Sequence, residues 1–393
     1  MPELVDIYRA ARAAEQRGEP CWLATVMRVR GSAYRHAGAR LLFSSGQVLS
    51  GSVSGGCLEA SIVRKGPWLT REHAACVRYE GGREQRQEEE QDEEPPQGTG
   101  CDGTVDILLE RVNLAENQPL TLLEHCLAEE RRAALVTVFQ SNDPSVAVGA
   151  RLALDEAGAN ASTIGNASAS VALSWAAARA LGETHPQAQT VHGNGFEALL
   201  EVIEPAPHLF VFGAGPDALP VVEFARALGL GVTVCESNPR VAVRERFALR
   251  CELHLGSVRG VLPKLTARRT PLAVVMSHHY PTDRDALDLL LRSPARYIGM
   301  LGPARRTHRM LNELFTERGL PTLDLSRLHA PIGLDLGAET PEQIALAIVA
   351  EIQAVLAGTS AKPLSSRSGR PIHAAANELT LARAPHLART GTR

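Results

Sequence analysis

Short runs of alternating apolar and polar residues dominate the first 110 positions of this 393-residue chain. A charged amphipathic stretch near residues 3–17 predicts a helix, and the aliphatic and β-branched residues of 21–30 favour a strand. A short helix is expected directly after the glycine-rich stretch at residues 51–57, with Gly66 and Pro67 as its stop. Further strands are predicted at residues 41–43, 47–49, 75–79 and 104–110. Residues 1–118 are therefore expected to form an α+β unit.

Residues 119–205 read as a connecting α+β segment, which we expect to pack with the preceding unit. Pro205 and Pro207 mark its boundary with the rest of the chain. Helices are predicted at 120–130 and 169–181, and strands near 133–140, 147–154 and 201–204.

From His208 onward, short buried strands alternate with helices, ending in a helix over about residues 341–356. The strands are predicted at 209–212, 232–235, 273–277 and 297–300. Alternation of this kind predicts a doubly wound parallel sheet. The fold class is therefore α/β, with an N-terminal α+β unit joined to a C-terminal Rossmann-like domain over residues 206–358. A flexible tail is expected over 359–393.

The first strand of this domain leads into Gly213-Ala214-Gly215-Pro-Asp-Ala218, which satisfies the dinucleotide fingerprint G-x-G-x-x-G/A. Gly213 permits a tight turn, and Gly215 lets the backbone approach a phosphate. Glu236 ends the next strand and could accept hydrogen bonds from ribose hydroxyls. The pattern favours phosphate or nucleotide binding, for instance of NAD(P), over its alternative, a purely structural turn.

Further polar candidates follow the later strands, at the edge where open parallel sheets bind ligands. His278 could supply a polar group there, with His279 and Asp283 nearby. Adjacent histidines point in different directions in regular structure, so joint metal binding is not expected. Gly302 and Arg305 lie at a predicted helix start that could receive a phosphate, and an exposed arginine is the alternative.

Charge and composition narrow the classes of partner. The net charge is −3, so no basic excess points to nucleic acid. Residues 80–97 are rich in acids and contain no apolar side chain, which predicts a disordered loop. No run approaches the roughly 18 apolar residues of a membrane span, and no secretory leader pattern is present, so a cytoplasmic protein is expected.

Seven cysteines without a C-x-x-C pair argue against a disulfide scaffold or a structural zinc site. Two of them, Cys57 and Cys101, are framed by glycines. Cys57 follows Ser54-Gly55-Gly56 at a predicted helix start, where free N–H groups and the helix dipole lower a thiol pKa and suit an anionic ligand. A small buried hydrophobe is the alternative. The remaining thiols are expected in the core: Cys21, Cys76, Cys126, Cys235 and Cys251.

Several long motifs occur in the order typical of one family. Residues 31–40 read GSAYRHAGAR, residues 51–59 read GSVSGGCLE, and residues 100–103 read GCDG. Later, residues 297–302 read YIGMLG and residues 331–337 read PIGLDLG. Together these motifs resemble the XdhC/CoxI family, the maturation factors of xanthine and CO dehydrogenases. The resemblance covers most of residues 1–110 and 205–357.

The resemblance implies a cofactor chaperone rather than a turnover enzyme. Such proteins bind the molybdenum cofactor (molybdopterin), a pterin dithiolene that bears phosphate, and help it receive a terminal sulfido ligand. They then deliver it to an apo molybdenum hydroxylase of the xanthine or CO dehydrogenase type. A cysteine desulfurase is a candidate further partner, and a homodimer is expected.

By this analogy Cys57 is the leading cofactor contact, touching the metal through the cofactor, and Cys101 is the second. The expected cofactor-binding residues are Cys57, Cys101, Ser54, Gly55, Gly56, Arg35, Gly213, Ala214, Gly215, Glu236, His278, Gly302 and Arg305.

The chain also departs from the family pattern. Asp102 stands where the second cysteine motif usually has a glycine, and Glu236 replaces an expected aspartate.

Two other functions compete with the chaperone hypothesis. The turn at residues 213–218 favours an NAD(P)-dependent oxidoreductase, and the two glycine-framed thiols would suit a redox sensor that forms a Cys57–Cys101 disulfide.

Overall fold

A computed structural model describes most of the chain. The described residues are 2–31, 33–56, 58–80, 103–114, 117–184, 186–237, 244–247, 250–318, 324–366 and 377–381. They fall into two compact units, one of Glu3–Pro205 together with the C-terminal segment and one of Ala206–Arg367. The mixed α/β architecture with a parallel sheet in the second unit confirms the predicted fold class. We call these units unit 1 and unit 2.

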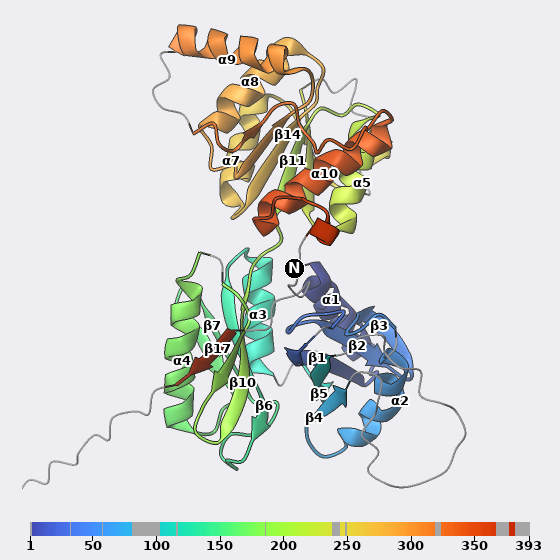
Figure 1. Cartoon of the computed structure of the whole chain (residues 1–393), viewed down its shortest axis with the longest axis vertical. Helices are drawn as coiled ribbons and strands as arrows, with labels where there is room; N and C mark the ends of the chain where they lie inside the picture. The colour runs from blue at the N-terminus through green and yellow to red at the C-terminus, as the bar shows by residue number, and fades with distance from the viewer. Residues whose placement is uncertain are drawn as a thin grey trace, which may run out of the picture. The chain divides into compact units, whose positions relative to one another are not determined.

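Unit 1 contains an antiparallel sheet of five strands in the order β3-β2-β1-β5-β4 (Figure 1). Its strands are β1 (Cys21–Arg30), β2 (Arg40–Ser44), β3 (Gln47–Gly51), β4 (Ala75–Glu80) and β5 (Thr104–Val112), and its helices are α1 (Pro2–Gln16) and α2 (Glu59–Leu69). β1 lies at the centre, between β2 and β5, as expected for its long run of buried residues. The acidic segment falls in residues 81–102, outside the described residues.

The prediction that Gly66 and Pro67 stop α2 is wrong, because the helix continues to Leu69. Pro67 lies inside the last turn, and the helix ends two residues after it. Thr70 closes the helix, since its N–H and its Oγ1 donate to the Gly66 carbonyl at 3.1 and 2.8 Å. Gly66 serves packing instead: an added Cβ would lie 2.7 Å from Cζ of Phe43.

The second sheet of unit 1 has six strands in the order β17-β9-β10-β6-β7-β8. They are β6 (Ala133–Ser141), β7 (Arg151–Asp155), β8 (Asn160–Ser162), β9 (Gln189–His192), β10 (Phe196–Ile203) and β17 (Asn377–Thr380), with helices α3 (Gln118–Ala128) and α4 (Ala167–Leu181). β17 corrects the expectation of a wholly flexible tail, because it pairs in parallel with β9. Leu379 and Leu381 pack against the core beneath α4, which explains why this short segment is held.

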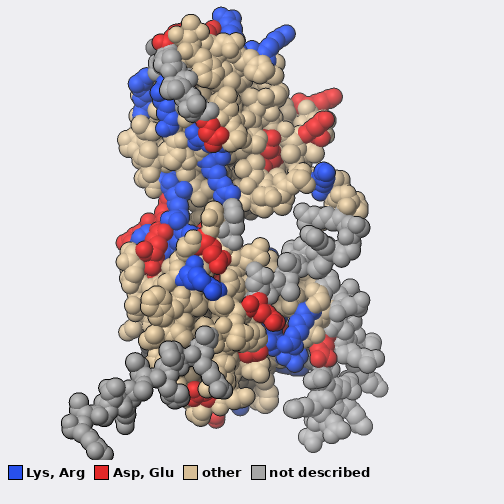
Figure 2. Space-filling view, turned by 60° about the vertical axis from the view of Figure 1, so that its left-hand side comes forward, with Lys and Arg blue, Asp and Glu red and all other residues tan. Residues whose placement is uncertain are grey.

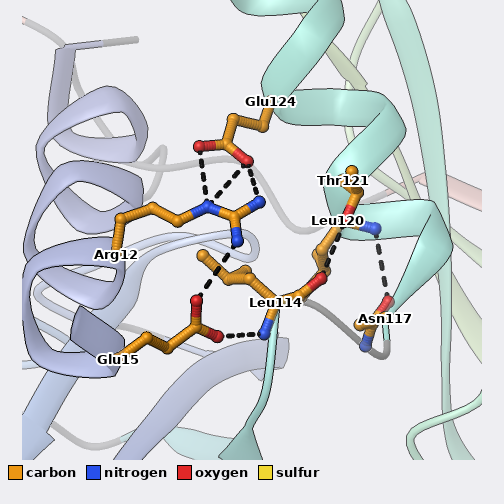
Figure 3. A network of polar contacts seen from close by, with 7 residues as sticks. All are labelled: Arg12, Glu15, Leu114, Asn117, Leu120, Thr121 and Glu124. Atoms are coloured by element: carbon orange, nitrogen blue, oxygen red, sulfur yellow. Dashed lines mark hydrogen bonds and ion pairs between the residues drawn. The ribbon is translucent and has the colours of Figure 1, made fainter. Parts of the chain in front are cut away.

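α1 and α3 lie side by side and share one apolar core with both sheets of unit 1. Figure 3 shows the polar contacts that join them. Arg12 on α1 donates from Nη2 to Glu124 on α3 at 2.6 Å. Glu15 accepts from the Leu114 N–H at 2.5 Å, and Asn117 caps α3 by accepting from the Leu120 N–H at 3.2 Å. These bonds fix how the chain passes from the first sheet to the second.

Two buried ion pairs connect strands of the two sheets. Arg40 on β2 pairs with Glu201 on β10, and Arg151 on β7 pairs with Glu110 on β5, where the Nη1–Oε2 distance is 2.7 Å. All four residues are at most 7% exposed. Burial lowers the pKa of Arg40 to about 10, which leaves it charged at neutral pH. A buried charge without its partner is costly, so each pair depends on both members.

Unit 2 is built on a parallel sheet in the order β13-β12-β11-β14-β15-β16. The strands are β11 (His208–Phe212), β12 (Gly231–Glu236), β13 (Glu252–Leu255), β14 (Pro271–Val275), β15 (Tyr297–Met300) and β16 (Leu328–His329). α5 (Ala218–Ala227) and α10 (Pro341–Ala357) cover one face (Figure 1). α7 (Leu262–Ala267), α8 (Tyr280–Leu291) and α9 (Ala304–Arg318) cover the other. Shorter helical turns are α6 (Arg244–Phe247), Val258–Val261 and Leu364–Ser366.

A partly buried carboxylate fixes the β16 edge of this sheet. Glu351 on α10 accepts from the Tyr297 hydroxyl at 2.5 Å and from the Gly333 N–H at 2.9 Å, and it lies 3.2 Å from Nδ1 of His329. The segment 331–337, which carries one of the motifs above, is thereby tied to α10 and β15.

Acidic and basic side chains lie interspersed on the face shown in Figure 2. Within the described ranges, no helix is both long and apolar enough to cross a membrane.

Removing one member of a buried ion pair of unit 1 should destabilise the protein far more than replacing both members by apolar residues. We expect Arg151→Met to lower the free energy of unfolding by about 3–5 kcal/mol, because Glu110 is left buried and charged. The double variant Arg151→Met, Glu110→Leu should recover most of that loss. Urea unfolding measures both, with Arg9→Ala at an exposed pair as a control that should change stability by under ~1 kcal/mol. A double variant as unstable as the single one contradicts the prediction.

His208 should make unit 2 sensitive to mild acid. Its Nε2 lies 2.8 Å from Oγ1 of Thr233, and burial lowers its pKa to about 4 from the ordinary 6.5. The unfolded chain therefore binds a proton first, so stability should fall as pH drops from about 6.5 to about 4, by about 3 kcal/mol in total. Unfolding of wild type and His208→Gln across this range tests it: the variant should lose less stability, and parallel pH curves would refute the assignment.

Candidate functional site

The first candidate region is the glycine loop between β3 and α2, residues 51–59. Cys57 within it and Cys101 elsewhere in unit 1 both lie outside the described residues, so their predicted roles stay predictions. α2 begins at Glu59, which places Cys57 two residues before the helix.

Glu59 organises this loop by accepting hydrogen bonds from its backbone. Its carboxylate accepts from the N–H groups of Val53, Ser54 and Gly56 at 3.2, 2.8 and 3.1 Å, and from the Ser54 hydroxyl. Ser54 Oγ in turn accepts from the Gly56 and Leu58 N–H groups at 3.2 and 3.1 Å. Partial burial raises the pKa of Glu59, but the hydrogen bonds from Ser54 and Val53 outweigh it and lower that pKa overall.

These contacts change the expected role of the loop. Among the described residues of the loop, the N–H groups of Val53, Ser54 and Gly56 donate to Glu59, and that of Leu58 donates to Ser54. The protein therefore supplies its own anion for the N–H groups of Val53, Ser54 and Gly56.

Arg35 contacts the loop indirectly, through Glu3 on α1. Its Nη2 donates to both oxygens of Glu3 at 2.6 and 2.5 Å, and Glu3 accepts from the Ser52 N–H at 3.2 Å. Gly51 has φ +80°, and an added Cβ would lie 2.2 Å from the Arg40 carbonyl oxygen, so only glycine fits. The predicted cofactor contact Arg35 thus holds α1 against the loop.

An aromatic side chain flanks the loop on the surface. Tyr34 is 65% exposed, and its ring packs beside Gly55, where an added Cβ would lie 3.7 Å from the ring. This neighbour had no signal in the sequence beyond its place in the motif at residues 31–40.

The other cysteines mostly follow expectation. Cys21, Cys126 and Cys235 are buried and Cys251 is partly so, but Cys76 is exposed. The prediction of a core position is wrong for Cys76 because residues of β4 alternate between the core and solvent, and Cys76 lies on the solvent face. No group of three potential metal ligands occurs among the residues that the structure describes.

The second candidate region is the carboxyl edge of the parallel sheet in unit 2. Gly213 has φ +127°, and an added Cβ would lie 2.6 Å from the Met276 carbonyl oxygen, so the turn after β11 lies directly against the loop after β14. Glu236 at the end of β12 accepts from the Ala214 N–H at 3.1 Å. Gly215 leaves room for Asp217, whose Oδ1 would be 2.4 Å from a Cβ at that position.

His278 reaches this turn from the loop after β14. Its Nε2 lies 2.7 Å from Oδ2 of Asp217, and its backbone has φ +59°, which is uncommon outside glycine. Asp283 is 1% exposed and holds the loop: it accepts from the Ser277 hydroxyl at 2.5 Å and pairs with Arg306 at 2.7 Å.

The structure therefore brings five predicted residues together at this edge: Gly213, Ala214, Gly215, Glu236 and His278. Gly302, with φ +121°, and the exposed Arg305 follow the next strand, β15. Asp217 was missed, because inside the fingerprint its position is an unspecified x, and only its pairing with a residue 61 positions away gives it a role.

A parallel sheet with a glycine turn, joined to an α+β unit, defines a two-unit protein with a Rossmann-like domain. Residues 209–352 match the XdhC Rossmann domain, and residues 14–80 match the XdhC and CoxI family. The chain belongs to the XdhC and CoxI family, as the motif resemblance predicted. This is a family of xanthine dehydrogenase accessory factors.

Proteins similar to the chain include two curated relatives and a solved structure. A probable xanthine dehydrogenase subunit of Bacillus subtilis is 30% identical over 342 residues, covering 85% of this chain and 92% of that protein. The uncharacterized protein YqeB of Escherichia coli is 30% identical over 161 residues, 41% of this chain and 29% of that protein. A crystal structure described as a xanthine dehydrogenase from Bacillus halodurans aligns with a TM-score of 0.70 at 27% identity, covering 92% of this chain and 98% of that one.

Glu59→Gln should loosen the glycine loop, because a neutral amide accepts hydrogen bonds more weakly than a carboxylate. Backbone amides at residues 53, 54 and 56 should exchange roughly tenfold faster in hydrogen-exchange measurements. Wild type should show the same loosening as pH falls below about 4.5, since the lowered pKa of Glu59 means its contribution is lost on protonation. Glu72→Gln, at an exposed position just after α2, is the control. Unchanged exchange in Glu59→Gln would contradict the assigned role.

Proposed function

We propose that this chain binds the molybdenum cofactor, assists its sulfuration and inserts it into an apo molybdenum hydroxylase of the xanthine or CO dehydrogenase type. The observation that carries the proposal is similarity across 92% of a relative whose name places it with xanthine dehydrogenase. A cysteine desulfurase as sulfur donor, a homodimer and a cytoplasmic location belong to the same proposal.

The described neighbours of Cys57 are compatible with this role. Molybdenum and sulfur are soft centres, for which a thiolate is a suitable contact. Glu59 holds the backbone on both sides of Cys57, through Gly56 before it and Leu58 after it by way of Ser54. When bound, the cofactor supplies a redox-active molybdenum held by a dithiolene.

The competing hypothesis, an NAD(P)-dependent oxidoreductase, has less support. Its fingerprint is present, but the Ala214 N–H and the Glu236 carboxylate that it would use for pyrophosphate and ribose bond to each other. The structure thus offers an internal partner for both groups.

The cofactor proposal predicts that purified full-length protein carries or takes up about one molybdopterin per chain. Fluorescence of the oxidised pterin released on heat denaturation, together with molybdenum analysis, measures this. Cys57→Ser should lower retention roughly tenfold or more, because a soft metal–sulfur contact is replaced by a hydroxyl.

Cys76→Ser is a matched control, since Cys76 is an exposed thiol of the same unit on the edge strand β4. It should retain as much pterin as wild type. Wild-type protein that never takes up the pterin would refute the proposed function, and equal loss in both variants would refute the role of Cys57.

A further inference from the structure

Helix α4 of unit 1 exposes large apolar side chains on its outward face. Its inward side chains are buried in the core beside the second sheet: Leu173, Ala176, Ala177 and Ala180. On the outward side Val171 is 58% exposed and Trp175 is 75% exposed. A surface helix normally turns charged and polar residues to water, so this face indicates a surface that another molecule covers.

The two exposed side chains form one continuous patch. Val171 and Trp175 are four residues apart, which makes them neighbours on the same face of the helix. The other exposed positions along this face are small: Ala167, Ser168 and Ala178. Small side chains on both sides of a bulky centre let a second helix approach closely. Trp175 then has the size and the central place of an interface anchor.

The patch carries opposite charges at its two ends. Arg179 is exposed in the last turn of α4. Asp143 lies at the start of the helix, because the N-cap residue Asn166 donates from Nδ2 to its Oδ2 at 3.4 Å. Within the described part of the chain, neither Arg179 nor Asp143 has an ion-pair partner. Each charge is therefore available to a partner molecule.

This pattern is complementary to a second copy of itself. A two-fold contact uses the same patch on both molecules, so the patch must match its own image. In an antiparallel pair of α4 helices centred at Leu173, Trp175 lies opposite Val171 of the second copy. The same arrangement brings Arg179 to the end of the helix where Asp143 of the second copy lies. A parallel pair would bring like charges together instead.

A membrane surface fits this face less well. Helices that lie in a membrane interface carry several Lys or Arg residues on their polar side. α4 has one charged residue, Arg179, among its fifteen, and Asp143 places a negative charge at its start. The charges therefore favour contact with a protein surface over contact with lipid.

We infer that α4 is the contact surface of a homodimer, in which two copies of the helix pack antiparallel through Val171 and Trp175, with Arg179 of each copy paired with Asp143 of the other. The homodimer itself belongs to the proposed function, on which this inference rests, and α4 is the surface assigned to it. One pair of fifteen-residue helices is small beside the roughly 1,200–2,000 Å² of a standard interface, so we expect a dimer that dissociates on dilution.

Sedimentation equilibrium of the full-length protein between about 1 and 100 µM tests this, and wild type should dissociate reversibly in that range. Trp175→Glu should weaken dimerisation roughly tenfold or more, because it replaces a central aromatic anchor by a charge. Trp68→Glu is the matched control, since Trp68 is a 62% exposed tryptophan on α2 of the same unit, and it should dimerise like wild type. Thermal unfolding of each variant confirms that it folds.

A charge exchange tests the antiparallel register. Arg179→Glu places acid against acid and Asp143→Lys places base against base, so each variant alone should dimerise more weakly than wild type. An equimolar mixture of the two variants should form a heterodimer, because opposite charges then meet at both ends. Wild type that stays monomeric at about 100 µM, a dimer unaffected by Trp175→Glu, or a mixture that associates no better than its components would overturn the inference.

Retention of the pterin by the same proteins separates this inference from cofactor binding. Wild type that retains the cofactor as a monomer refutes the α4 interface and leaves cofactor binding standing. Wild type that dimerises through α4 but never takes up the pterin supports the interface and refutes the proposed function.

Discussion

Unit 1 depends on two buried ion pairs that join strands from different sheets, Arg40 with Glu201 and Arg151 with Glu110. Charges this deep are tolerable only as satisfied pairs, so the sheets are locked in one arrangement. Gly38 must lack a side chain because an added Cβ would lie 2.4 Å from Oε2 of Glu201. The backbone of Arg40 in turn packs against the glycine loop that carries Cys57, at Gly51. Arg40 therefore links the two features: its side chain pairs with Glu201, and its backbone carbonyl packs against the loop at Gly51.

The same device recurs in both units: a carboxylate accepts hydrogen bonds from backbone N–H groups of a glycine-containing segment. Glu59 does this for the loop around Cys57, Glu236 for the turn at Ala214, and Glu351 for Gly333. Such segments resemble anion-binding loops when only their residues are known, because glycines and free amides are what an anion site needs. Here the anion comes from the protein, so these N–H groups already have an acceptor.

Most of the fold could be predicted from local pattern. The strands β1 and β11 are continuous runs of mostly buried residues, and the long helix α10 has a helical pattern with clear caps; the structure places all three where the sequence indicates. The errors have physical causes. α2 runs past Gly66 because that glycine serves contact with Phe43, and β17 forms because Leu379 finds a core that is distant in sequence. Cys76 is exposed because it lies on the same face of β4 as the charged Arg78 and Glu80, an alternation that the prediction of a core position overlooked.

For the candidate site too, some features follow from the sequence and others only from the tertiary structure. By itself the sequence determined the order of elements, the glycine turns, the family and the residues at strand ends, since each depends on periodicity or on a contiguous motif. Only the tertiary structure decided which of those residues are partners. Arg40 and Glu201 are 161 positions apart, and Asp217 and His278 are 61 positions apart. Pairings of this kind arise when sheet order and register bring distant strand ends together, and no local pattern records them.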